Sequence, residues 1–172
     1  MIDLSRALWL DVEASGFGPD SYPIEVGWSD IQGRTGSVLV RPEPAWTHWD
    51  SKAEALHGIS RALLGAEGVP VVEAATRISD ATAGRSAVLS NHPGPDAWWL
   101  ERLFTAAGKR TVPFRLANAD ALVTSFVGGG LTGMGEYVVA EEQAKELAPI
   151  THRAADDARF WATFTRLVVE GA

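Results

Sequence analysis

Residues 6–13 form a largely apolar segment bounded by the turn residue Gly16, and this pattern predicts a β-strand. Successive side chains of a strand leave opposite faces, so one face here is apolar and the other carries two acids. The two faces consist of Leu8, Leu10 and Val12 and of Trp9, Asp11 and Glu13. The carboxylates of Asp11 and Glu13 therefore leave the same face, two residues apart.

Similar patterns predict the other elements of the chain. Further strands are expected at residues 23–30, 35–41, 87–90 and 113–116. Helices are expected at residues 51–58, 70–83, 96–107, 120–126, 136–147 and 151–169, with loops at 41–50 and 128–130. A strand meander followed by alternating helices and strands predicts an α/β fold, with a mixed central β-sheet of about five strands flanked by helices.

Two of the predicted helices place a carboxylate at the head of an apolar stripe. The stripes are Asp96, Leu100, Leu103 and Ala107 in one helix, and Asp157, Trp161, Phe164 and Val168 in the other. Asp156 falls about 100° away around its helix, so helical phase selects Asp157 as the inward acid. We therefore expect Asp96 and Asp157 to face the sheet, on which Asp11 and Glu13 already lie.

Four converging carboxylates are costly to bury unless cations sit between them. The chain has no cysteine, and a site built from oxygen ligands favours a hard cation such as Mg²⁺ or Mn²⁺. Two such ions about 3.5–4 Å apart stabilise the attacking and leaving oxygens of a phosphodiester displacement. The reaction also needs a base near neutral pH. We expect His152 to supply it, from the start of the last helix.

Composition adds limits to this hypothesis. A length of 172 residues predicts one domain, spanning residues 1–172. The net charge is −7, whereas a protein that binds nucleic acid by phosphate neutralisation alone should be basic. Either the protein avoids nucleic acid, or bound cations make the phosphate contacts, and composition leaves both open. With no long apolar run, secretory signal or cysteine, we expect a cytoplasmic protein with no membrane partner.

Five segments of the chain resemble, in order, the motifs of the DEDDh (DnaQ-like) 3′→5′ exonucleases. They are LWLDVEASG, ALHGIS, SNHPGPDAWWL, NADALV and HRAADDA. The resemblance implies an RNase H-like fold in which Asp11, Glu13, Asp96 and Asp157 bind two divalent metal ions and His152 is the base. It implies hydrolysis at the 3′ end of single-stranded DNA or RNA, or of short oligonucleotides, to release nucleoside 5′-monophosphates.

The resemblance also suggests substrate contacts. Ser15, Gly16 and Phe17 follow the first motif and are expected near the terminal nucleotide. His57 either contacts the substrate or closes the helix before Gly58. The pair Ala14-Ser15 departs from the two hydroxyl-bearing residues found in many relatives, so contacts to the terminal nucleotide can differ. Gly94-Pro95 replaces the aromatic or apolar residue that often precedes the acid of the second motif.

Other polar and aromatic residues have simpler explanations. Asp120 is expected to cap a helix, and Glu25 is expected to have a structural or solvated role rather than to bind metal. The segment 128–130 lacks the ending of a phosphate-binding loop and is expected to be a connector. Trp46 and Trp49 lie in a predicted loop, where they are candidates for stacking on bases.

Two alternatives to the exonuclease hypothesis remain at this stage. One is a phosphodiesterase of the same metal chemistry that acts on short oligonucleotides or on a small nucleotide, which the acidic composition favours. The other is a non-catalytic nucleic-acid-binding module with the same fold. Many relatives form homodimers, but no pattern in the chain decides the oligomeric state.

Overall fold

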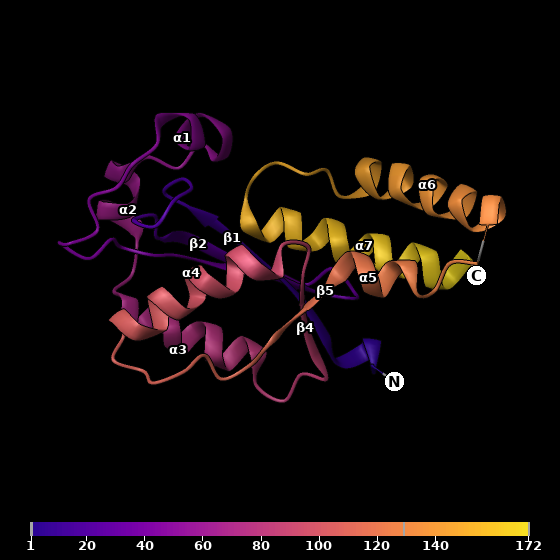
Figure 1. The fold of residues 1–172 in the computed structure, drawn as a ribbon, viewed down its shortest axis with the longest axis horizontal. Coiled ribbons are helices and arrows are strands. Elements are labelled where there is room, and N and C mark those ends of the chain that lie inside the picture. Colours follow the sequence, from indigo (N-terminus) through magenta and orange to yellow (C-terminus); the bar gives the residue numbers. More distant parts are fainter. Residues whose placement is uncertain (1, 129, 172) are drawn as a thin grey trace.

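The computed structural model describes residues 2–128 and 130–171, which form a five-stranded sheet with helices packed on both faces (Figure 1). The strands are β1 (Ala7–Ala14), β2 (Pro23–Asp30), β3 (Thr35–Leu39), β4 (Ala87–Ser90) and β5 (Leu116–Asn118). The helices are a short 3-10 helix (Leu4–Arg6), α1 (Ser51–His57), α2 (Arg61–Glu67), α3 (Val71–Thr82), α4 (Pro93–Ala106), α5 (Ala119–Thr124), α6 (Gly130–Leu147) and α7 (Ala154–Gly171).

The sheet is mixed, as the sequence predicts. Its order is β3-β2-β1-β4-β5. The first three strands pair antiparallel, whereas β1 with β4 and β4 with β5 pair parallel. The carboxyl ends of β1 and β4 therefore lie at the same edge of the sheet, and this edge carries the ends of the two strands that precede the candidate site.

The alternation along β1 divides the hydrophobic core into two layers. Leu10 and Val12 pack in the layer that contains Leu100 of α4 and Ile78 of α3. Trp9 packs instead with small residues of α7 on the opposite face. Asp11 and Glu13 share the parity of Trp9, so their side chains leave the sheet on the face that α7 covers.

The first turn of α7 lies directly on β2 beside these acids. Gly27 is the cross-strand partner of Asp11. A Cβ atom at Gly27 would lie 2.1 Å from the backbone N of Ala155 and 2.2 Å from the carbonyl carbon of Ala154. The absence of a side chain at this position therefore allows the amino end of α7 to approach the sheet backbone closely.

Hydrogen bonds show which residues cap two of the helices. Helix α1 begins at Ser51, as predicted, and Asp50 caps it, since its side chain accepts the N–H of Lys52 at 2.8 Å. Asn118 rather than Asp120 caps α5. The Asp120 carboxylate instead accepts a hydrogen bond from the hydroxyl of Tyr137 at 2.6 Å.

Other boundaries also differ from the prediction. Helix α4 begins at Pro93, a residue suited to the first helical position, so Asp96 lies in the first turn rather than at the start. Strand β5 covers residues 116–118, not 113–116, and α2 was not predicted. Helix α6 begins at Gly130 rather than at residue 136; of the predicted loop 128–130, residue 129 lies outside the described residues. No helix in the described part of the chain is long and apolar enough to cross a membrane.

Candidate metal centre

The candidate site is a cavity of about 690 Å³ at the carboxyl end of β1, beside the amino ends of α4 and α7. All five residues that the sequence singles out line it, namely Asp11, Glu13, Asp96, His152 and Asp157. They come from three separate parts of the chain, and the sheet order together with the placement of the two helices brings them together. Whether they hold metal is a question of geometry and charge.

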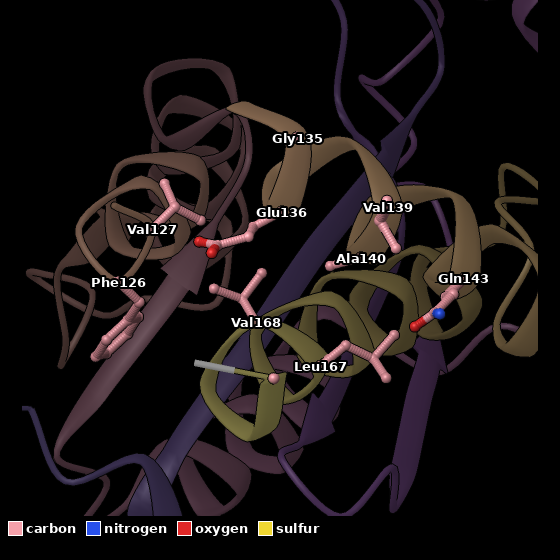
Figure 2. Close-up of a pocket in the computed structure, with 10 residues that line it drawn as sticks. Phe126, Val127, Gly135, Glu136, Val139, Ala140, Gln143, Leu167 and Val168 are labelled. Carbon is pink, nitrogen blue, oxygen red and sulfur yellow. The ribbon is translucent and has the colours of Figure 1, made fainter. Parts of the chain in front are cut away.

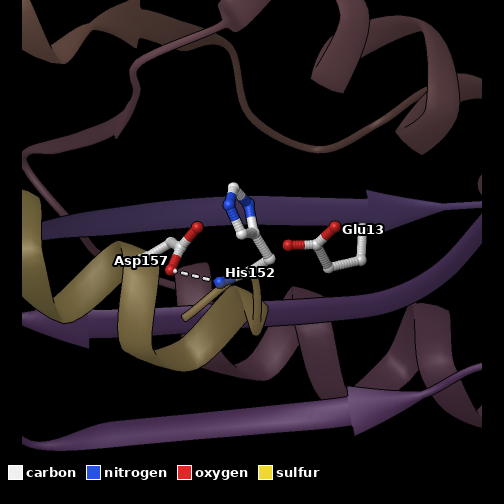
Figure 3. Close-up of side chains that lie close together, drawn as sticks. All are labelled: Glu13, His152 and Asp157. Atoms are coloured by element: carbon white, nitrogen blue, oxygen red, sulfur yellow. Dashed lines mark hydrogen bonds between the residues drawn. The ribbon is translucent and has the colours of Figure 1, made fainter. Parts of the chain in front are cut away.

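Three of these side chains form the tightest group. One ligand atom each of Glu13, His152 and Asp157 lies within 4.8 Å of the others, a spacing that suits one metal ion (Figure 3). The prediction that His152 lies in the last helix is wrong. The residue precedes α7, and its φ is 56°. The carboxylate of Asp157 accepts the backbone N–H of His152 at 3.2 Å and that of Thr151 at 3.0 Å. These two bonds stabilise His152 in a left-handed backbone conformation that residues other than glycine seldom adopt. They thereby fix the position of its imidazole.

An ion pair between the buried Glu25 and the partly exposed Arg153 fixes the segment between His152 and α7. Glu25, the cross-strand partner of Glu13, is 1% exposed. Its two oxygens accept hydrogen bonds from Arg153 at 2.8 and 2.9 Å, and one also accepts the N–H of Ala154 at 3.1 Å. Glu25 is therefore structural, as expected. The sequence analysis missed Arg153, although it stands within the HRAADDA segment.

Asp96 is held by the end of β4. It is 2% exposed, and the hydroxyl of Ser90 donates a hydrogen bond to its carboxylate. The same hydroxyl accepts the N–H of His92 at 2.9 Å. Burial raises the pKa of Asp96 to about 7, against the opposing effect of the Ser90 hydrogen bond. Ser90 is a second positioning residue that the sequence analysis did not identify.

Burial and mutual repulsion disfavour ionisation of the other acids as well. Burial raises the pKa of Asp11 well above its ordinary value, and the charges of Asp96 and Glu13 add to this effect. Burial, with the charge of Asp157 next in size, raises the pKa of Glu13 to about 8. Burial also raises the pKa of Asp157.

Basic side chains offset the repulsion between these carboxylates only in part, since the charge of Arg153 acts against the raised pKa of Glu13 without pairing with it. Within residues 2–128 and 130–171, none of the four acids forms an ion pair. Oxygen donors that repel one another in a partly buried cavity are the ligand set that a hard divalent cation prefers. The residues present therefore fit Mg²⁺ or Mn²⁺.

The raised pKa values predict that the metal-free protein loses stability as the pH rises. The folded protein holds protons on Glu13 up to about pH 8 and on Asp96 up to about pH 7, whereas the unfolded chain releases them near pH 4.5 and 3.8. Because the folded state binds more protons, its free energy of unfolding should fall between about pH 6.5 and about pH 9. Denaturant titrations in EDTA across this range measure the slope.

Two comparisons isolate the cause of this slope. Glu13→Gln cannot ionise and should flatten it, and Mn²⁺ should stabilise the wild type more at about pH 8.5 than at about pH 6.5, since binding expels the protons. Burial lowers the pKa of His57, an effect that acts on stability in the opposite direction and mostly below the chosen range. Stability that rises with pH in EDTA would contradict the assignment.

The predicted substrate residues do not share one environment. Gly16, Phe17 and His57 line the cavity, but Ser15 is 1% exposed and is not part of the lining. The Ser15 hydroxyl accepts the N–H of Tyr22 at 3.1 Å and forms a 3.0 Å hydrogen bond with Nδ1 of His48. The structure thus places this hydroxyl in the loop framework, and Phe17 projects at the mouth, 81% exposed.

His57 closes α1, which is one of the two roles that the sequence left open. It is the last residue of α1, and its Nδ1 accepts the N–H of Ile59 at 3.0 Å, beyond the left-handed Gly58. The proton of a neutral ring therefore lies on Nε2, which is buried and has no hydrogen-bond partner among the described residues.

The predicted stacking residues in the loop are not both exposed. Trp46 is 6% exposed and stacks on Tyr22, with ring centroids 5.1 Å apart, so the prediction of a stacking surface at Trp46 is wrong. Trp49 is partly buried and donates to Glu54 at 2.5 Å. Trp46 packs in the core cluster that contains Ile59 and Leu64, and the Trp49 ring lies 6.5 Å from that of His57, contacts that the composition of the segment does not reveal.

A second cavity, of about 460 Å³, lies between the end of α5 and the helices α6 and α7 (Figure 2). Its wall is mostly apolar, with Phe126, Val139 and Val168 among the side chains in Figure 2. Among the residues that line this cavity, Glu136 is the single acidic one. It offers no cluster of ligands, so the candidate chemistry belongs to the acidic cavity.

Comparison with known proteins finds matches among solved structures. No family model and no curated protein matches the chain. Among solved structures, it is similar to exonuclease I from Methylocaldum szegediense, with a TM-score of 0.69 and 16% identity over 95% of this chain and 40% of that one. E. coli exonuclease I in complex with a dA16 oligonucleotide gives a TM-score of 0.67 and 14% identity, over 94% of this chain and 40% of that one.

These matches bear on the fold. A third, E. coli exonuclease I in complex with a dT13 oligonucleotide, has a TM-score of 0.60 and 15% identity, over 92% of this chain and 39% of that one. The chain thus spans about two fifths of the length of these proteins. Identities this low show a common fold alone, and the α/β, RNase H-like architecture predicted from the sequence is confirmed.

Proposed function

We propose that the protein is a metal-dependent 3′→5′ exonuclease that hydrolyses phosphodiester bonds at the 3′ end of single-stranded DNA or RNA. The observation that carries the proposal is the convergence of four carboxylates and one imidazole in a single cavity. The fold shared with exonuclease I structures, two of them in complex with DNA oligonucleotides, supports the class of substrate. In this proposal residues 1–172 form one exonuclease domain.

Each residue has a separate role in the proposed reaction. Asp11, Glu13, Asp96 and Asp157 would hold two divalent cations, either Mg²⁺ or Mn²⁺. When bound, the cations would stabilise the attacking oxygen of water and the leaving 3′-oxygen of the phosphodiester. His152, which lies beside Glu13 and Asp157, takes the proton of the attacking water. Hydrolysis then leaves a nucleoside 5′-monophosphate and a strand shortened by one nucleotide.

Bound cations also resolve the difficulty posed by the net charge of −7. The carboxylates alone would repel a phosphodiester at the reacting position. Two divalent ions would balance the charge of the four carboxylates, so that the strand meets a neutral cavity instead of an acidic one. On this proposal the protein approaches nucleic acid through its cations rather than through a basic surface.

Metal removal should abolish the activity. With Mn²⁺ or Mg²⁺, we expect a 5′-labelled single strand to shorten one nucleotide at a time and to yield nucleoside 5′-monophosphates. Addition of EDTA should stop the reaction, and excess Mn²⁺ should restore it, as gel electrophoresis and chromatography of the products would show. Internal cleavage, removal of nucleotides from the 5′ end, or hydrolysis that persists in EDTA would each contradict the proposal.

The same experiment separates the alternatives when the substrate is varied. Single-stranded DNA, single-stranded RNA, a duplex and a dinucleotide are compared at equal concentration of 3′ ends. Turnover of the dinucleotide alone would favour a phosphodiesterase for short or small substrates. Binding of strands without any product would favour a non-catalytic module.

A further inference from the structure

Exposed aromatic side chains continue from the acidic cavity onto the outer surface of α4. Phe17 at the cavity mouth is 81% exposed, and Trp98 on α4 is 39% exposed. A hollow of about 310 Å³ joins them, since Phe17, Pro95 and Trp99 line both this hollow and the acidic cavity, whereas Trp98 lines the hollow only. The aromatic surface is therefore continuous with the candidate site.

A cation lies next to this surface, one helical turn further along α4. Arg102 and Trp98 line a further hollow of about 450 Å³. The guanidinium carbon of Arg102 lies 5.9 Å from the ring centroid of Trp98 and 5.7 Å from that of Trp46. Its Nη1 donates to the carbonyl of Pro19 at 3.0 Å, and no carboxylate pairs with it among the described residues. The positive charge of Arg102 is thus held in place but not neutralised.

The loop that carries Phe17 is fixed to the same helix. Trp99 donates from Nε1 to the hydroxyl of Ser21 at 3.0 Å, and that hydroxyl donates to the carbonyl of Gly18 at 2.8 Å. The rings of Phe17 and Trp99 lie 6.0 Å apart. Because Arg102 also binds this loop through Pro19, the two aromatic faces and the guanidinium belong to one connected surface.

We propose that Phe17, Trp98 and Arg102 form a track for the nucleotides of a single strand that lie on the 5′ side of the scissile bond. The bases stack on Phe17 and Trp98, and Arg102 contacts a phosphate between them. This inference rests on the proposed exonuclease function, which places the 3′ end in the cavity. The base faces are covered in a duplex, so the track accepts a single strand.

The track predicts that affinity depends on strand length. With Mn²⁺, Trp98→Ala should raise the KM for an octanucleotide by about tenfold, because a stacking contact is lost, and should leave the KM for a dinucleotide within about twofold. Trp98→Phe, which keeps an aromatic face, should restore most of the loss. Phe126→Ala is the matched control, because Phe126 is 37% exposed and lines the separate cavity near α5.

Arg102 has a readout of its own. For octanucleotide binding in EDTA, followed by fluorescence anisotropy, Arg102→Gln should reduce the slope of log affinity against log salt by about 0.7, the contribution of one phosphate of a single strand. An octathymidylate and an octauridylate, compared side by side, show whether the track takes DNA, RNA or both. An unchanged salt slope would overturn the role of Arg102.

The outcomes distinguish the track from the catalytic proposal. If Trp98→Ala raises the KM equally for both lengths, or for neither, the track is wrong even when hydrolysis proceeds. If no strand is hydrolysed but binding in EDTA still depends on Trp98 and on length, the exonuclease function is wrong and the track remains as a single-strand binding surface.

Discussion

Asp157→Asn is expected to lower Mn²⁺-dependent nucleotide release by roughly 10³-fold, or about 4 kcal/mol of the activation barrier, without unfolding the protein. Asparagine keeps the oxygen that accepts the N–H groups of Thr151 and His152, so the loop that carries the imidazole stays in place. It removes the negative charge that a cation requires. Single-turnover rates, with denaturant titrations in EDTA, measure the two effects separately.

Two further substitutions make this prediction specific. Asp156→Asn should keep full activity, because Asp156 lies one residue away and bonds to the Thr151 hydroxyl at 2.8 Å outside the cavity lining. His152→Ala should lower the rate by about 10²–10⁴-fold and leave the affinity for Mn²⁺, measured by calorimetry, nearly unchanged, as expected of a base. Loss of Mn²⁺ binding in His152→Ala would make the imidazole a metal ligand, and full activity in Asp157→Asn would defeat the proposed site.

Gly27→Ala should damage both stability and activity although residue 27 carries no functional group. Its added Cβ would meet the backbone of Ala154 and Ala155 at about 2 Å, and a backbone cannot move aside as a side chain can. We expect a loss of about 3 kcal/mol in the free energy of unfolding. Displacement of the first turn of α7 moves Asp157 and His152 relative to β1, and such a shift should lower activity by about 10²-fold.

The control for this substitution is the same chemical change at an open site. Gly65 lies within α2, and a Cβ at that position would meet no atom within 4 Å. Gly65→Ala should therefore raise the free energy of unfolding by about 0.5–1 kcal/mol and leave activity unchanged. If Gly27→Ala proves as stable and active as wild type, the close packing of α7 on β2 is not required for the site.

The side of the sheet and the phase of the helices could be predicted from local pattern. The alternation of faces in β1 places Asp11 and Glu13 on one side of the sheet, the side that α7 covers. The apolar stripe of α4 places Asp96 inward, and the full burial of Leu100 and Leu103 confirms this helical phase. These predictions succeed because apolar periodicity records which face of an element is buried, whatever the element packs against.

The positions that could not be predicted depend on hydrogen bonds that form only once the elements are in place. The conformation of His152 depends on the Asp157 carboxylate, which accepts its N–H, whereas the sequence pattern extended the last helix back to residue 151 and so included His152 in it. Asp50 and Ser51 are both suitable caps, and local sequence does not decide between them. The role of Ser90 follows only from the place where Asp96 meets the end of β4.

Helix α4 has a consequence for how a strand could advance after each cut. The helix carries Asp96 inside the cavity and Arg102 outside it, about 9 Å apart along the axis at 1.5 Å per residue. Because both residues belong to one rigid helix, the distance from the reacting bond to the proposed phosphate contact at Arg102 would stay constant while the strand shortens. Stacking on aromatic rings has little preference for one base over another. A strand that moves along the proposed track by one nucleotide would therefore break no sequence-specific hydrogen bond, and the next base could stack in the same position.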